Sequence, residues 1–199
     1  DLKEITAART TTDKGHEAYQ QLFAACASVM ELIVRNPKPV IAEVAGTATA
    51  AGCQLVASCD LAMASNTVKF ATPGVNLGLF CSTPMVALSR NVSRKHAMEM
   101  LLSGDMVDAS RAEQIGLINR AFNPDQLTSE TMAMALKIAS KSTMTIAIGK
   151  RAFYEQAEMP LNEAYAYTSQ VMTENMLTRD AEEGIGAFLG KRTPEWQDQ

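Results

Sequence analysis

Apolar residues recur at steps of three and four along the first part of the chain. The apolar positions between residues 13 and 36 are Tyr19, Leu22, Phe23, Cys26, Val29, Met30 and Ile33. This spacing puts their side chains on one face of a helix, with polar residues on the other face. Two prolines, Pro37 and Pro39, then stop the pattern. The spacing therefore predicts an amphipathic helix over residues 13–36.

A different pattern follows, in which short apolar runs alternate with small residues. Residues 39–45 (PVIAEVA) are typical of a buried strand, and residues 46–52 are Gly, Ala and Thr alone. Small residues let the backbone approach a ligand or another backbone closely. Residues 52–60 predict a helix, residues 61–65 a second strand and residues 68–72 a third. Strand, glycine-rich turn, helix and strand form a βαβ unit, which implies parallel strands.

Helical periodicity dominates the rest of the chain. Short helices are predicted over 85–91, 94–102 and 110–115, and a strand over 117–122. Gly104 and Gly116 stand where helices of this kind end. Longer helices are predicted over 125–141, 143–157, 161–177 and 179–190. In the last helix Ile185, Phe188 and Leu189 form an apolar stripe that needs a partner surface.

Composition and charge exclude some classes of function. A chain of 199 residues suits one domain, or one domain with a short appendage. The formal net charge of −4 argues against a nucleic-acid partner, which requires a basic excess. The longest apolar runs are too short to span a bilayer, and no signal peptide opens the chain. We therefore expect neither a nucleic-acid nor a membrane partner.

The cysteines and histidines suggest no metal site. None of the four cysteines forms a CxxC pair, so buried free thiols in a reducing compartment are favoured over a disulfide framework. His16 and His96 lack an HxxxH spacing, and a solvated or hydrogen-bonded role is favoured for both. The sequence therefore predicts no metal ligands.

The small-residue run at 46–52 is the candidate for chemistry. The first N–H groups of a helix lack intrahelical acceptors and carry the positive end of the helix dipole. A helix starting near Ala51, with almost no side chains around its first amide, could stabilise a developing oxyanion. Close packing of the helix on a strand explains the same small residues and is the favoured interpretation on this pattern alone, with the oxyanion site as the alternative.

Several segments in order resemble one family. They are DLKE (1–4), PVIAEVAGTATAAGCQLVASCDLAMAS (39–65), FATPGVNLGL (70–79), GLINRAF (116–122) and DAEEGIGAFLGKRTPEW (180–196). Together they resemble the enoyl-CoA hydratase/isomerase (crotonase) superfamily. One subgroup of that family is matched more closely by two segments, AAGCQLVASCD and FATPGVNLGLFCSTP.

The resemblance implies an α/β fold, in which residues 1–122 form a crotonase-like ββα spiral core. Residues 123–199 then form a C-terminal helical region that mediates trimerisation, often as a dimer of trimers. The chain starts abruptly at Asp1 with a charged stretch. We therefore expect that a natural N-terminal segment, with the first strands of the spiral, precedes it.

The resemblance also implies an acyl-CoA ligand, whose thioester oxygen lies between two backbone N–H groups. One N–H maps onto Ala51, and the other would precede Asp1. The remaining residues that match substrate-binding positions are Asp1, Leu2, Lys3, Gly46, Gly74, Phe188 and Lys191, the last two reaching a neighbouring subunit. CoA is part of the substrate, so no further cofactor is expected.

The sequence departs from the family at its two catalytic glutamates. The corresponding positions hold Gln54 and Gly74, and Ser82 stands where some isomerase and dehalogenase relatives place an acid. A glutamine can hydrogen-bond a water but cannot take its proton at neutral pH. The expected function is thus an enoyl-CoA hydratase-like lyase by family, without the two-glutamate machinery. The alternatives are a non-catalytic acyl-CoA-binding paralogue and an isomerase-type relative.

The expected compartment follows from the cysteine pattern and the motifs. A chain without disulfide patterning suits the cytosol or the mitochondrial matrix. The amino-acid sequences of the motifs favour a bacterial cytoplasm, or the mitochondrial matrix if the source is eukaryotic.

Overall fold

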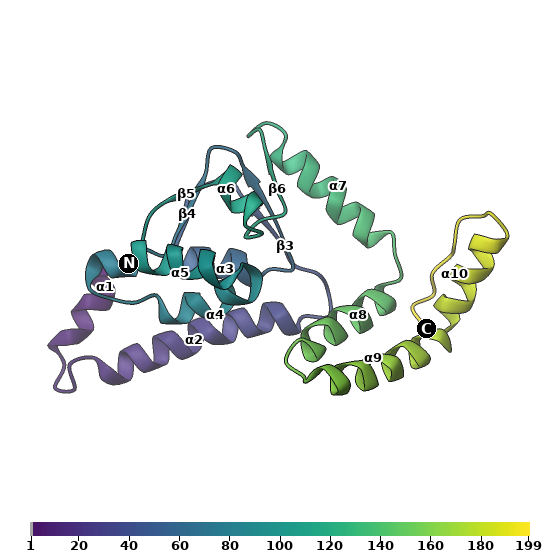
Figure 1. Cartoon of the computed structure of the whole chain (residues 1–199), viewed down its shortest axis with the longest axis horizontal. Coiled ribbons are helices and arrows are strands. Elements are labelled where there is room, and N and C mark those ends of the chain that lie inside the picture. The colour runs from purple at the N-terminus through teal and green to yellow at the C-terminus, as the bar shows by residue number, and fades with distance from the viewer. Residues whose placement is uncertain (1) are drawn as a thin grey trace.

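The computed structural model describes residues 2–199, so the predicted contact of Asp1 lies outside the described residues. Helices surround two small sheets, and the last helices extend away from them (Figure 1). The N-terminal half contains α1 (Leu2–Ala7), η1 (Ala8–Thr10), α2 (His16–Arg35), β1 (Ile41–Val44), β2 (Ala48–Thr49), α3 (Ala51–Ser58), β3 (Leu61–Ser65), β4 (Lys69–Ala71), η2 (Pro73–Leu77) and α4 (Ser82–Asn91). The remainder contains α5 (Arg94–Ser103), β5 (Val107–Asp108), α6 (Ala109–Gln114), β6 (Arg120–Phe122), α7 (Leu127–Ala139), α8 (Thr143–Gln156), α9 (Leu161–Met176) and α10 (Arg179–Leu189).

The predicted parallel βαβ unit is confirmed. Strand β1 pairs in parallel with β3, with Ile41 opposite Leu61, and β3 pairs in parallel with β6. The second sheet has the order β2-β4-β5, with β2 parallel and β5 antiparallel to β4. Strands β2 and β5 were not predicted. Each has two residues, which is too short for any alternation of polar and apolar positions to show.

The amphipathic helix predicted over 13–36 is α2, but its start was placed too early. Lys14 and Gly15 have φ values of 56° and 84°, which take the chain through a left-handed turn before the helix begins at His16. The Asp13 carboxylate accepts hydrogen bonds from the amides of Glu17 and Gly15, both at 3.0 Å. These bonds, with one from Thr11, lower the pKa of Asp13 to about 2. A charged side chain therefore fixes the turn.

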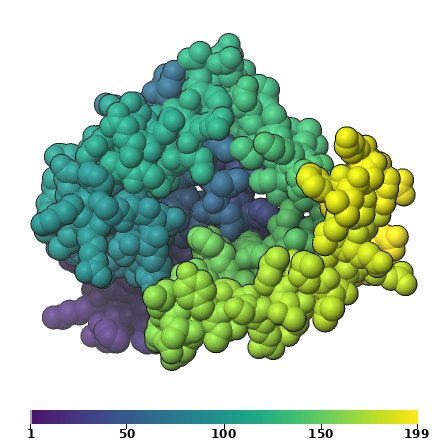
Figure 2. All heavy atoms as spheres, turned by 45° about the vertical axis from the view of Figure 1, so that its right-hand side comes forward, coloured from purple at the N-terminus to yellow at the C-terminus, as the bar shows by residue number. Residues whose placement is uncertain are grey.

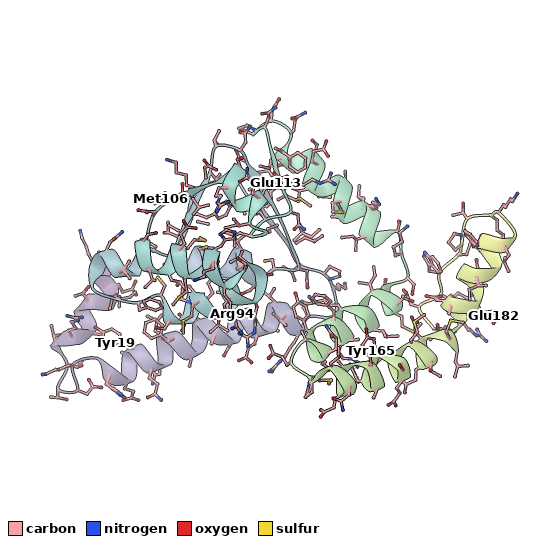
Figure 3. The ribbon with its side chains drawn as sticks, in the orientation of Figure 1. Tyr19, Arg94, Met106, Glu113, Tyr165 and Glu182 are labelled. Carbon is pink, nitrogen blue, oxygen red and sulfur yellow. The ribbon has the colours of Figure 1, made fainter. Side chains whose placement is uncertain are left out.

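The core lies between the sheets and helices α3 to α6. Its largest fully buried side chains are Phe70, Met63 and Leu88, and α3 packs along α4. Helix α2 crosses below this layer, and the Tyr19 hydroxyl ties it to α1 by donating to the Ile5 carbonyl at 3.1 Å (Figure 3). Burial of this apolar cluster is what holds α3 and its first turn in place.

The helices predicted over 125–190 are α7 to α10, with ends within two residues of the prediction. Helix α7 packs on β1 and β3, whereas α8 and α9 pack on each other and α10 lies at the far end from α1 (Figure 1). Figure 2 shows a face that is hollowed where these helices curve around the core. No helix within residues 2–199 has the length and apolar character needed to cross a membrane.

The apolar stripe of α10 has no partner surface among the described residues. Phe188 is 82% exposed and Leu189 is 74% exposed. Helix α9 also presents apolar side chains to solvent, including Tyr165, which Figure 3 labels on that helix. Within residues 2–199 all strands lie between Ile41 and Phe122, and the helices after Phe122 expose much of their apolar surface. The division at residue 122 and its oligomerising role stay predictions.

Candidate functional site

A strained residue turns the chain into helix α3. Strand β2 lies beside β4, and the next amide, that of Ala50, donates to the Ala71 carbonyl at 3.0 Å. Ala50 has φ 48° and ψ −114°, a region that glycine populates and other residues avoid. A non-glycine residue in such a conformation is characteristic of functional sites, where surrounding structure holds the strain.

The amide of Ala51 follows this turn. Within residues 2–199 it donates to no protein acceptor, and Ala51 is exposed. The first helical turn closes behind it through the Gln54 amide, which donates to the Ala50 carbonyl at 2.9 Å. The free N–H thus stands at the positive end of an eight-residue helix. An anion or a polarised carbonyl oxygen is the group that such an amide binds.

Gln54 lies one turn further along α3 and is only 4% exposed. Its Oε1 is 3.7 Å from the Cys26 Sγ of helix α2, a long contact in which the thiol is the donor. It also lines a cavity of about 380 Å³ between α2, α3 and α4. An amide at this place can orient a polar group in the cavity but cannot act as a general base.

Gly74 is buried in η2, under the loop that follows it. A Cβ at this position would lie 2.9 Å from the Cys81 Sγ and 3.0 Å from the Leu79 carbonyl oxygen. The Leu79 amide donates to the Gly74 carbonyl at 3.0 Å, so the loop folds directly back on this residue. The glycine is therefore required by packing, and the space of a longer side chain is already filled. A substrate contact at Gly74 stays a prediction.

Ser82 and Cys53 offer no activated nucleophile. The Ser82 hydroxyl donates to the Phe80 carbonyl at 3.3 Å, and no histidine or carboxylate within residues 2–199 hydrogen-bonds to it. Burial, and then the neighbouring Cys81, raise the pKa of Cys53 to about 12, so its thiol stays protonated at neutral pH. All four cysteines are free, but only Cys53 and Cys81 are buried, whereas Cys26 and Cys59 are half-buried. The prediction of four buried thiols was therefore wrong for two of them.

The other predicted binding residues lie apart from Ala51. Leu2 and Lys3 are on α1, Phe188 is on α10, and these helices stand at opposite ends of the molecule (Figure 1). Lys191 follows α10 with φ 51°. Gly46 precedes β2 and faces open space. Within one chain, Ala51 and Gln54 therefore lie on the same helix, and Gly74 lies in η2. Phe188 and Lys191 lie far from these three residues.

A buried ionic cluster was missed by the sequence analysis. The Lys150 ammonium donates to an Asp60 carboxylate oxygen at 2.7 Å and to the carbonyls of Ile33 and Lys38 at 2.9 and 3.0 Å. The other Asp60 oxygen accepts from the Tyr154 hydroxyl at 2.9 Å. Burial, with this bond, raises the pKa of Tyr154. Asp60 thus joins α8 to the core.

A buried hydroxyl beside the α3 turn was also missed. Thr72 directly follows Ala71, whose carbonyl accepts the hydrogen bond from the Ala50 amide. The Thr72 side chain is fully buried, and its Oγ1 has no hydrogen-bond partner within residues 2–199. Sequence gives no signal for it, since threonine is common in strands. In the same described range, no three His, Cys, Asp or Glu side chains gather as a metal ion would need. The absence of metal ligands stays a prediction.

Comparisons with known proteins place this geometry in context. The family model described as enoyl-CoA hydratase/isomerase matches residues 1–199. The chain is 50% identical over 196 residues to enoyl-CoA hydratase domain-containing protein 3, mitochondrial, of Mus musculus, covering 98% of this chain and 64% of the relative. The chain thus spans about 64% of the length of that relative. The predicted finer match, to the subgroup of that protein and its bacterial relatives, is confirmed.

Solved structures agree with this match. The crystal structure of an enoyl-CoA hydratase from Mycobacterium smegmatis has a TM-score of 0.93 at 52% identity, covering 98% of this chain and 74% of that one. The crystal structure of human enoyl-CoA hydratase domain-containing protein 3 has a TM-score of 0.91 at 50% identity, covering 98% and 76%. Fold, motif order and overall identity agree, and the chain belongs to the enoyl-CoA hydratase/isomerase family.

Proposed function

We propose that this chain carries part of an acyl-CoA site, in which the Ala51 amide polarises the thioester carbonyl. The observation that supports this is the unpartnered Ala51 N–H, exposed at the start of α3 behind the strained Ala50. An oxyanion donor of this kind acts by stabilising charge that develops in the transition state. The class of reaction is that of an enoyl-CoA hydratase-like lyase or isomerase.

The proposal includes a second donor. From the family resemblance we expect it just before Asp1, so that two N–H groups would hold the thioester oxygen. Removing one donor from such a pair costs roughly 10²–10³ in turnover. Leu2 and Lys3 on α1 would lie along the CoA moiety, and no further cofactor is needed.

Hydration by two glutamates is not part of the proposal. Gln54 cannot accept a proton at neutral pH, and the side-chain space at Gly74 is filled by Cys81 and Leu79. A related reaction such as isomerisation needs one base instead of two, and neither Gln54 nor Gly74 supplies it.

A second candidate function is acyl-CoA binding without turnover. Two observations favour it: Gln54 is buried against Cys26, and Ser82 has no base beside it. Such a paralogue would bind CoA thioesters through the Ala51 amide and release them unchanged.

Binding and turnover distinguish these candidates. Calorimetry with a saturated acyl-CoA measures binding, and the absorbance of crotonyl-CoA at high protein concentration measures hydration. Failure to bind any acyl-CoA removes both candidates. Binding without loss of absorbance removes hydration, and a shift of the double bond in a 3-enoyl-CoA would then identify isomerisation.

A single substitution tests the amide itself. Proline is well tolerated at the first position of a helix, so Ala51→Pro removes the N–H while the helix can still form. We expect acyl-CoA binding or turnover to fall, whereas the matched variant Ala51→Ser, which keeps the N–H, retains both. Unchanged binding in a folded Ala51→Pro protein contradicts the assignment.

The proposed assembly is a homotrimer, or a dimer of trimers. The exposed apolar side chains of α9 and α10 support it, because exposed apolar residues that gather on one face often mark an interface with another chain. Phe188 and Lys191 would then reach the CoA of the neighbouring subunit. Light scattering on the purified protein tests this directly, since a monomer at micromolar concentration excludes it.

The proposed compartment is the bacterial cytoplasm, or the mitochondrial matrix for a eukaryotic source. The free cysteines support a reducing compartment. The name of the mouse relative includes "mitochondrial", which supports the second alternative by similarity.

A further inference from the structure

We propose that Cys26 is a covalent modification site for 2-enoyl-CoA thioesters. Its thiol adds to C3 of an acyl chain whose carbonyl oxygen is held by the Ala51 amide. The inference rests on the proposed acyl-CoA function, and it adds a reaction in which the protein itself supplies the nucleophile. It is supported by the contact between Cys26 and Gln54 and by the unpaired amide nitrogen of Gln54.

The Gln54 side chain indicates that a ligand belongs beside the Cys26 thiol. Gln54 is 4% exposed and lines the cavity of about 380 Å³ between α2, α3 and α4. Its Oε1 accepts the long contact from Cys26, but its Nε2 donates to no protein acceptor within residues 2–199. Leaving a nearly buried amide nitrogen without an acceptor is unfavourable, and buried polar groups are almost always paired. A polar atom of a bound ligand would satisfy it.

Cys26 lies close to the place where C3 of such a ligand would be. It belongs to α2, which packs on α3, and its Sγ is 3.7 Å from the Gln54 Oε1. Met30, one turn further along the same face of α2, lines the cavity. Gln54 is three residues from Ala51, an advance of roughly 4.5 Å along the axis of α3. Since C3 is two bonds beyond the carbonyl carbon, an enoyl group that extends along α3 from the Ala51 amide brings C3 to the thiol.

The hydroxyl groups that line this cavity are engaged elsewhere. The Ser58 Oγ donates to the Gln54 carbonyl at 2.8 Å, and the Tyr154 hydroxyl donates to Asp60 at 2.9 Å. The Cys26 thiol is half-buried, and among the described residues it hydrogen-bonds only to the neutral Gln54 amide. Thiols are stronger nucleophiles than hydroxyls, and sulfur prefers the conjugated C3 of an enoyl thioester to its carbonyl carbon. Cys26 is therefore the group best suited to this addition.

The proposed addition needs no co-reactant. The sulfur forms a bond to C3, the C2–C3 π bond breaks, and its electron pair moves to the thioester oxygen, where the Ala51 N–H stabilises the enolate. The carbonyl then re-forms as C2 takes up the proton that the thiol has lost. The product is a saturated acyl-CoA joined to Cys26 through a thioether, and no atom is released.

Intact-mass spectrometry of the whole chain tests the addition. In the presence of a phosphine reductant, which removes any mixed disulfide with free CoA, crotonyl-CoA should raise the mass by one crotonyl-CoA molecule. Peptide mapping should place this increase on Cys26. Butyryl-CoA, which lacks the double bond, should leave the mass unchanged, and an excess of it should slow labelling because both thioesters occupy the Ala51 site. An unchanged mass with crotonyl-CoA overturns the inference, as does transfer of the acyl group alone, which shows attack on the carbonyl carbon.

Variants separate the thiol from the amide. Cys26→Ser should abolish the mass increase, whereas the matched control Cys59→Ser, at the other half-buried cysteine, should be labelled like the unmodified protein. Ala51→Pro should slow labelling roughly 10²-fold, since it removes the donor that stabilises the enolate. Labelling that persists in Cys26→Ser, or that is equally fast in Ala51→Pro, contradicts the inference. Peptide mapping of the unmodified protein decides the matter if Cys26→Ser does not fold.

The addition and the acyl-CoA function fail in different ways. If calorimetry shows that butyryl-CoA does not bind, the proposed acyl-CoA function is wrong. If butyryl-CoA binds and crotonyl-CoA leaves the mass unchanged, the acyl-CoA site stands and only the role of Cys26 is wrong. The absorbance of crotonyl-CoA separates addition from hydration, because addition stops at one equivalent per chain. A loss that continues beyond one equivalent, without an adduct, replaces the inference with hydration.

Discussion

The core of residues 41–122 and the helices of residues 127–189 are held by different forces. The core buries its large side chains, including Met63, Phe70 and Leu88. In the later helices Leu127 is the only buried large apolar residue among the described positions, the other buried apolar residues there being alanines. Their large apolar side chains are mostly exposed, and polar contacts attach them instead, such as Lys150 with Asp60.

Because of this difference, substitutions should affect the core and the later helices in different ways. In the core, a position tolerates or rejects a side chain according to the space around it and the backbone angles. Among the helices after residue 127, α8 is anchored by the buried Lys150–Asp60 pair, and the exposed apolar side chains of α9 and α10 are left for another surface. Substitutions in the two regions should therefore differ in size and in how they respond to pH.

Lys150→Met should have the largest effect. It removes the ammonium, which is 6% exposed, and leaves the Asp60 carboxylate and two carbonyls without that partner. Removing one member of a buried ion pair costs about 3–5 kcal/mol, since the other charge stays buried. Urea unfolding should show this loss of stability. Lys137→Met, at an exposed position of α7, is the control and should stay within about 0.5 kcal/mol.

Gly74→Ala should have the next largest effect, this time in the core. The new Cβ meets the Cys81 Sγ at 2.9 Å and the Leu79 oxygen at 3.0 Å, and overpacking of this kind costs about 1–3 kcal/mol. Gly46→Ala meets nothing within 4 Å and should be neutral. Thermal or urea unfolding measures both.

A double-mutant cycle locates the clash at Gly74. Adding Cys81→Ala to Gly74→Ala should recover part of the lost stability, because the two side chains compete for one space. Additive losses from the two substitutions would mean that the thiol is not the obstacle. The loss that remains reflects the backbone contacts with the Leu79 carbonyl and the Cys81 nitrogen, which no side-chain change can remove.

Ala50→Gly should have a smaller effect with the opposite sign. The substitution relieves the strain of φ 48° and ψ −114°, which costs about 1–3 kcal/mol, and adds a glycine entropy cost of about 0.5–1 kcal/mol. A net gain of about 1 kcal/mol in urea unfolding is expected. A loss of stability would show that the turn before Ala51 is not strained.

The sequence predicted elements better than it predicted contacts. Periodicity found α2 and α7 to α10, since long helices repeat their pattern over several turns, whereas the two-residue strands β2 and β5 left none. The accessible amide at Ala51 was foreseeable because small residues surround it. The reason for Gly74 was not, because only the folded loop brings Cys81 against it.

The anchors of the later helices could not be predicted for a related reason. Asp60 and Lys150 are 90 positions apart, and each looks like an ordinary surface charge in its own segment. Their pairing depends on the packing of α8 against the end of α2, which no local pattern encodes.

Acid should detach the segment 191–199 before the core unfolds. Arg192 forms a bidentate pair with Glu183, which lowers the pKa of Glu183 from 4.5 to about 2. Because the folded state favours the ionised Glu183 carboxylate, the pair contributes its full stability above pH 4.5. This stability is lost as the pH falls from 4.5 towards 2 and the carboxylate takes up a proton. Hydrogen bonds from Ser142 and the Gln197 amide also lower the pKa of Asp180, so its stabilising contribution is lost on acidification as well.

The single tryptophan reports this step, because Trp196 lies against Gly184 and its indole N–H donates to the Ser140 carbonyl at 2.9 Å. Its emission should shift to the red between pH 4.5 and 2 while the circular dichroism of the core persists. Arg192→Gln should move this shift to higher pH, since Glu183 then titrates nearer its ordinary value. Arg179→Gln should not, since the Arg179 guanidinium donates to the Gln199 side chain and is not among the groups that lower the pKa of Glu183. If the tryptophan emission and the circular dichroism changed at the same pH, the C-terminal segment and the core would unfold together. The difference between the two regions would then not extend to their stability.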